Sequence, residues 1–97
     1  MSRAFVSEDQ EGPDPRHRFP LPPVSDPGYD EAAARALLQG AHEGDSAAAE
    51  EATGYRFGEA KLVPYVHAIL ERARKDGNDR LEQLAERFLR KAGARVD

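Results

Sequence analysis

Apolar residues after Pro27 recur at the three- and four-residue spacing of helices that bury one face. The first stretch begins at the acidic pair 30–31, ends near Gly44 and places on one face Ala33, Ala34, Leu37, Leu38 and Ala41. A second, shorter stretch over residues 46–53 has an alanine face, and Gly54 follows it. Asp45 or Ser46 can cap this second helix. The pattern predicts a first helical hairpin over residues 29–53.

The remainder of the chain predicts a second hairpin, over residues 59–92. Its first helix begins near Glu59, with Pro64 in the opening turn, where a missing amide hydrogen costs least. A turn at 76–78 separates it from a last helix that Asn78 or Asp79 can cap. The two apolar faces are Leu62, Val63, Val66, Ile69, Leu70 and Ala73, then Leu81, Leu84, Ala85, Phe88 and Leu89. We expect an all-α fold over residues 28–97, either a four-helix antiparallel bundle or tandem helical hairpins.

Residues 1–27 show neither a helical nor a strand period. Six of the seven prolines lie between Pro13 and Pro27, and proline biases the residue before it toward extended geometry. We expect an extended or disordered N-terminal arm. Phe5, Phe19 and Leu21 are candidate partner-binding side chains in this arm, since extended peptides dock in grooves. The alternative, which we favour slightly, is that the arm folds back and enlarges the small core.

The two hairpins also resemble each other. Residues 36–41 align with residues 68–73, 32 positions later, and Gly44 with Asp45 matches Gly77 with Asn78, 33 positions later. This pattern is similar to tetratricopeptide-type repeats, whose period is about 34 residues. The resemblance implies a protein that binds peptides or protein surfaces. The competing interpretation is that any two alanine-rich hairpins share such signals.

Composition narrows the function classes. The chain of 97 residues has no cysteine and a net charge of −4, which predicts a cytoplasmic protein and does not favour direct nucleic-acid binding. No apolar run is long enough to cross a membrane. Residues 28–58 carry six acidic and two basic residues, whereas residues 59–97 carry seven acidic and nine basic. This polarity is suited to docking on a protein partner.

Catalytic patterns are absent from the sequence. The histidines are His17, His42 and His67, and no pair has the spacing of metal ligands on one helix. No serine lies in a nucleophile elbow, and no glycine-rich phosphate loop occurs. We therefore expect neither an enzyme nor a cofactor or metal site.

A short aromatic connector over residues 54–58 is the most distinctive local feature. Tyr55, Arg56 and Phe57 together have the composition of an interface anchor, and they complete the candidate partner-binding set. Tyr55 and Phe57 can equally fill the seam between the hairpins, which is the role we favour. Arg56 is harder to place in a core, because a buried arginine needs a partner.

The opening Ser2-Arg3-Ala4-Phe5-Val6, followed by Glu8 and Asp9, resembles the start of some members of the Gre-type bacterial transcription elongation factor family. The resemblance covers about 30 residues and implies a bacterial protein tied to RNA polymerase. The rest of the chain has neither the long coiled coil nor the β-rich domain of that family. The sequence thus favours a small helical protein–protein interaction module without catalytic activity, and the alternative is a transcription-associated factor that binds RNA polymerase. A homodimer is a further use for spare apolar surface.

Overall fold

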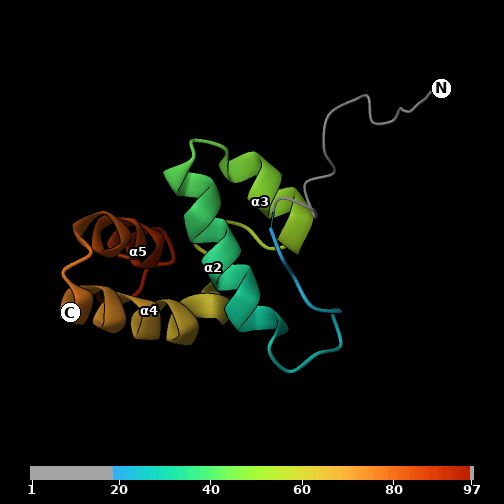
Figure 1. Ribbon diagram of the computed structural model, residues 1–97, viewed down its shortest axis with the longest axis horizontal. Coiled ribbons are helices and arrows are strands. Elements are labelled where there is room, and N and C mark those ends of the chain that lie inside the picture. Colours follow the sequence, from blue (N-terminus) through green and yellow to red (C-terminus); the bar gives the residue numbers. More distant parts are fainter. Residues whose placement is uncertain (1–18, 97) are drawn as a thin grey trace.

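The computed structural model describes residues 19–96, and this part of the chain folds as an all-α domain. Figure 1 shows its helices and the connections between them. Within the described residues the elements are α2 (Tyr29–His42), α3 (Ser46–Thr53), the 3-10 turn η1 (Ala60–Leu62), α4 (Val63–Asp76) and α5 (Asp79–Lys91). The all-α fold class predicted from the sequence is confirmed.

Two of the side chains that the sequence predicts as helix caps bind backbone amides at the helix starts. The Asp45 carboxylate accepts a hydrogen bond of 3.2 Å from the amide of Ala48 at the start of α3. The Asn78 side chain accepts one of 3.1 Å from the amide of Leu81 at the start of α5. Gly77 ends α4 with a φ of 68°, a left-handed conformation that favours glycine. Local chemistry thus fixes where each hairpin turns.

Helix α2 is the central element of the fold. It packs against α3, η1, α4 and α5, whereas α4 and α5 pair with each other and α3 pairs with α2. In Figure 1, α2 crosses the middle of the molecule, with α3 on one side and the α4/α5 hairpin on the other. The fold is therefore two helical hairpins joined through one shared helix.

The core extends into the predicted N-terminal arm. Phe19 is 1% exposed and belongs to the main apolar cluster, and residues 19–28 run alongside the helices before α2 begins (Figure 1). The other large side chains that are fully buried in the described residues are Leu37, Leu38, Leu62, Val66, Leu70, Leu84, Phe88 and Leu89. Burying a phenylalanine of this kind contributes about 1.5–3 kcal/mol. The core of the helical domain therefore includes Phe19, which precedes residue 28.

The first hairpin is held by close approach of backbones. A Cβ atom placed on Gly40 of α2 would lie 2.6 Å from the Ala49 Cβ of α3 and 3.0 Å from the Asp45 carbonyl oxygen. No methyl group fits at such distances. Glycine at this position lets α2 and α3 pack more closely than larger side chains allow.

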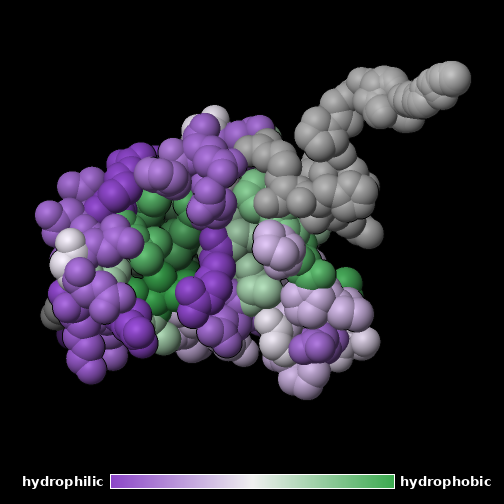
Figure 2. Space-filling view, in the orientation of Figure 1, coloured by the Kyte–Doolittle hydropathy of each residue, from purple (hydrophilic) through white to green (hydrophobic). Residues whose placement is uncertain are grey.

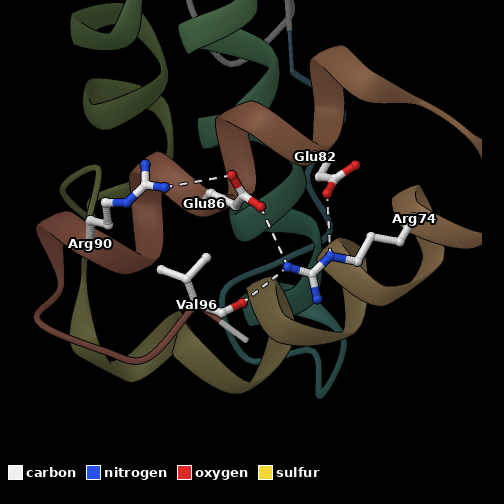
Figure 3. Close-up of polar contacts among 5 residues, drawn as sticks. All are labelled: Arg74, Glu82, Glu86, Arg90 and Val96. Atoms are coloured by element: carbon white, nitrogen blue, oxygen red, sulfur yellow. Dashed lines mark hydrogen bonds and ion pairs between the residues drawn. The ribbon is translucent and has the colours of Figure 1, made fainter.

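The second hairpin has a polar contact network at its surface. The Arg74 guanidinium of α4 lies 3.3 Å from a Glu82 carboxylate oxygen and 3.4 Å from a Glu86 carboxylate oxygen of α5. It also donates to the Val96 carbonyl at 3.4 Å, and Arg90 contacts Glu86 at 3.6 Å. Figure 3 shows Glu82, Glu86 and the Val96 carbonyl around the Arg74 guanidinium, with Arg90 in contact with Glu86. One arginine thereby links α4, α5 and the segment after α5.

Candidate interaction groove

The aromatic connector of residues 54–58 serves mainly to close the seam between the hairpins. The Phe57 ring is 8% exposed and meets the Phe88 ring of α5 edge-on, with ring centroids 5.0 Å apart. The Phe57 amide donates to a Glu50 carboxylate oxygen of α3 at 2.9 Å. Phe57 thus contacts both hairpins from within the core. As a candidate partner contact it is corrected to a core residue.

Tyr55 connects the same segment to the start of α2. Its hydroxyl group donates to an Asp30 carboxylate oxygen at 2.7 Å. This hydrogen bond, with a smaller contribution from burial, raises the pKa of Tyr55 above its ordinary value of 10.0. The Lys61 ammonium lies 5.9 Å from the centre of the Tyr55 ring, and the negative charge of ionised Tyr55 raises the pKa of Lys61. The half-buried Tyr55 is therefore held in place by polar contacts on this chain.

The remaining sequence candidates do not form one surface. Phe19 lies in the core, so a role as a partner contact is contradicted by its burial. Leu21 is half-buried against the core, and Arg56 is exposed. Phe5 lies outside the described residues. Of the candidates within residues 19–96, only Arg56 is exposed.

A groove lies at the junction of α2, α4 and α5. It has a volume of about 330 Å³ and is lined by Arg35, Leu38, Gln39, His42, Ile69, Asn78, Arg80, Leu81 and Leu84. We call this surface the interhelical groove. In Figure 2, apolar surface shows between α2 and the α4/α5 hairpin and is bordered by hydrophilic surface. The groove thus has an aliphatic floor and a polar rim.

The floor of the groove is continuous with the hydrophobic core. Leu38, Ile69 and Leu84 are 2%, 5% and 2% exposed, so only small parts of these side chains reach the groove. Leu81 is half-buried and lies at its edge. A short apolar side chain of a partner that enters the groove would contact these core residues directly. Its apolar surface would be removed from water, which favours binding.

The rim of the interhelical groove is basic although the chain as a whole is acidic. Arg35 and His42 come from α2 and Arg80 comes from α5, while none of its described lining residues is acidic. The Arg80 guanidinium donates to Nδ1 of His42 at 3.4 Å, which links the two sides of the groove. Arg35 also forms an exposed ion pair of 3.2 Å with Glu31. The local charge therefore favours an anionic group at this site.

A second hollow continues the interhelical groove along α4. It shares Arg35, Ile69 and Leu81 with the first and is further lined by Glu31, Pro64, Tyr65, Ala68 and Arg72. Its volume is about 470 Å³. The two hollows are neighbours, and the side chains of Arg35 and Leu81 line both of them.

Among residues 19–96 no group of three or more His, Cys, Asp or Glu side chains is arranged to hold a metal ion. In the same part of the chain, no helix has the length and apolar character needed to cross a bilayer. No protein-family model matches the chain, and neither curated proteins nor solved structures give a significant match. Support for an interaction surface therefore comes from the geometry of the interhelical groove.

Sequence reasoning missed the groove because its residues come from three helices. From the sequence, His42 is considered only as a possible metal ligand, and Leu81 belongs to an apolar face. The one available signal was the polar spacing of Arg35, Gln39 and His42 on α2, which places them along one side of a helix. That spacing does not reveal that Arg80 lies across from them.

Proposed function

We propose that this protein is a small helical protein–protein interaction module without catalytic activity, and that the interhelical groove is its contact surface. The observation that carries the proposal is the meeting of an aliphatic floor and a basic rim on one concave surface formed by both hairpins. Interfaces gain most of their energy where apolar groups are enclosed and charged groups are complementary at the edge.

The module is expected to recognise a segment of its partner rather than a broad face. Val24 is the only large apolar side chain that is strongly exposed in the described residues, at 76%. A standard protein interface covers about 800 Å² on each partner and needs a wider apolar patch than this. A peptide-like segment that enters the groove needs much less exposed apolar surface.

Charge reversal at Arg80 tests the proposal. Arg80 is the second residue of α5, where a glutamate interacts favourably with the helix dipole, so Arg80→Glu is expected to leave stability unchanged. Arg87→Glu is the matched control, because Arg87 lies on the same helix, is exposed and lines a different hollow. The full chain carrying an affinity tag is expected to retain a stoichiometric partner from its native cell, and to lose it in R80E but not in R87E.

Equal retention of the partner by both variants would show that the groove is not the contact surface. The same capture addresses the alternative partner implied by the N-terminal resemblance. Subunits of RNA polymerase are expected in the eluate if the protein acts in transcription. Their absence at low ionic strength would remove that alternative and leave the groove-based proposal in place.

A further inference from the structure

We infer that the interhelical groove takes a short acidic segment of a partner protein, with one or two apolar side chains next to carboxylates. The inference rests on the proposed function, since it names the chemistry of the partner that the same surface recognises. It follows from three features of the groove, which are its charge, its size and the nature of its floor.

The charge of the groove is the first step. Arg35 of α2 and Arg80 of α5 line the groove from different helices, and both give it positive charge. Guanidinium groups bind carboxylates through paired hydrogen bonds, and such charge-assisted bonds are stronger than neutral ones. Arg72, whose guanidinium is paired with Asp76 at 3.2 Å, lines the second hollow, where Glu31 is the single acidic lining residue. Glu31 is itself paired with Arg35.

The contrast with the rest of the protein makes this charge informative. The chain carries −4 overall, and residues 28–58, which include α2 and α3, hold six acidic residues against two basic ones. A basic partner would be attracted to much of this surface but would meet like charges in the groove. An acidic segment is favoured in the groove, because none of its described lining residues is acidic.

The size and floor of the groove set the apolar part of the segment. A volume of about 330 Å³ is near the lower limit for ligand pockets and accommodates one or two side chains. The floor consists of Leu38, Ile69 and Leu84, which are aliphatic and complement a leucine or phenylalanine side chain. This floor also argues against a nucleic-acid strand, whose bases bind best by stacking on aromatic rings.

A direct binding experiment tests the inference with the full chain. The probe is a fluorescein-labelled twelve-residue peptide in which leucine and phenylalanine alternate with pairs of glutamates. The comparison probes are the same peptide with lysine in place of glutamate and a single-stranded oligonucleotide of similar length. Fluorescence anisotropy is expected to show saturable binding of the acidic peptide, weaker by about tenfold or more for R80E and unchanged for R87E.

Several results would overturn the inference. These are equal binding of the lysine peptide, equal or tighter binding of the oligonucleotide, and equal loss in R80E and R87E. Thermal unfolding of both variants is measured alongside, so that a loss of folding is not mistaken for a loss of binding. A second variant, Leu81→Ala, probes the apolar edge and is expected to weaken the peptide about three- to tenfold.

This chain itself contains a short segment with the proposed chemistry, in which Phe5 and Val6 precede Glu8 and Asp9. A further variant tests whether this segment, and not a partner's, occupies the groove. The double variant Phe5→Ser, Val6→Ser is expected to bind the acidic peptide as the unaltered chain does. Tighter binding by tenfold or more would assign the groove to this chain's own residues and would overturn the inference of a partner segment.

The two proposals fail in different ways. Binding of the acidic peptide with no partner captured from cells would support the inferred chemistry and count against the proposed function. Capture of a partner that R80E abolishes, without any binding of the acidic peptide, would support the function and refute the inferred chemistry.

Discussion

The two hairpins of this protein pack their helices together with side chains of different size. The α2/α3 hairpin packs through alanine and glycine, with Gly40 against Ala49 at its closest point. The α4/α5 hairpin packs through large side chains such as Leu84, Phe88 and Leu89, and adds the polar contacts of Arg74 at its surface. Small residues give close backbone approach with little buried area, while large residues give area at a greater helix separation.

This difference determines which hairpin tolerates change and in which direction. The first hairpin has no room for added atoms, so it is sensitive to enlargement. The second depends on the volume of its side chains, so it is sensitive to truncation. Substitutions in the two hairpins test this contrast through their effect on the free energy of unfolding.

Truncation of Phe88 is expected to have the largest effect. Phe88 is 0% exposed and contacts the Phe57 ring, so Phe88→Ala leaves a cavity at the seam between the hairpins. We expect a loss of about 3–5 kcal/mol in the free energy of unfolding, measured by urea denaturation. A loss below about 1 kcal/mol would show that the second hairpin does not depend on side-chain volume.

Enlargement of Gly40 is expected to have the next largest effect. Alanine normally stabilises a helix by about 1 kcal/mol relative to glycine, but here its methyl group would lie 2.6 Å from the Ala49 Cβ. We expect Gly40→Ala to lower the free energy of unfolding by about 1–3 kcal/mol. Arg72→Ala, at the aligned and exposed position of the second hairpin, is the control and is expected to change it by at most about 0.5 kcal/mol. Stabilisation by Gly40→Ala would refute the close-approach argument.

The bond between Tyr55 and Asp30 is expected to make stability depend on pH at alkaline values. Because the pKa of Tyr55 is raised in the folded state, its contribution is fully present below pH 10.0 and is lost as the pH rises through the raised pKa. We expect Tyr55→Phe to cost about 1 kcal/mol at pH 8. The stability difference from the unaltered protein should shrink between about pH 10 and pH 12. A difference that stays constant over this range would mean that the hydroxyl group does not titrate with this bond.

Removal of the Arg74 contacts is expected to have the smallest effect. The Arg74 side chain is 40% exposed, and ion pairs at such sites contribute little because solvent screens them. We expect Arg74→Ala to cost about 1 kcal/mol or less at low ionic strength, and about half as much in 1 M salt. An effect as large as that of Phe88→Ala would show that polar contacts, and not apolar volume, hold the second hairpin together.

Much of the local structure was predictable because its causes lie close together in the sequence. The cap at Asp45, the cap at Asn78 and the left-handed turn at Gly77 each depend on a few neighbouring residues. The apolar spacing of Leu84, Phe88 and Leu89 predicted which face of α5 is buried. In these places propensity, capping and periodicity all point to one structure.

The candidate contact residues were harder to assign. Phe19 and Phe57 have the composition of interface anchors, but aromatic side chains serve equally well in a core, and their burial shows the core role. A buried arginine needs a partner for its charge, but Arg56 is exposed, so its guanidinium group does not enter the core. The basic rim was not predictable, because Arg35 and Arg80 are 45 positions apart and line one groove only when α2 packs against α5.

The sequence by itself determined that the chain is helical, where its two hairpins turn, and that it carries no motif for catalysis. These properties depend on hydrogen bonds and apolar spacing within about one helical turn. The tertiary structure decided that α2 is the shared helix, that Phe19 completes the core and that a basic groove forms in an acidic protein. Such features arise from side-chain shapes that meet across distant parts of the chain, so they exist only once the helices have packed.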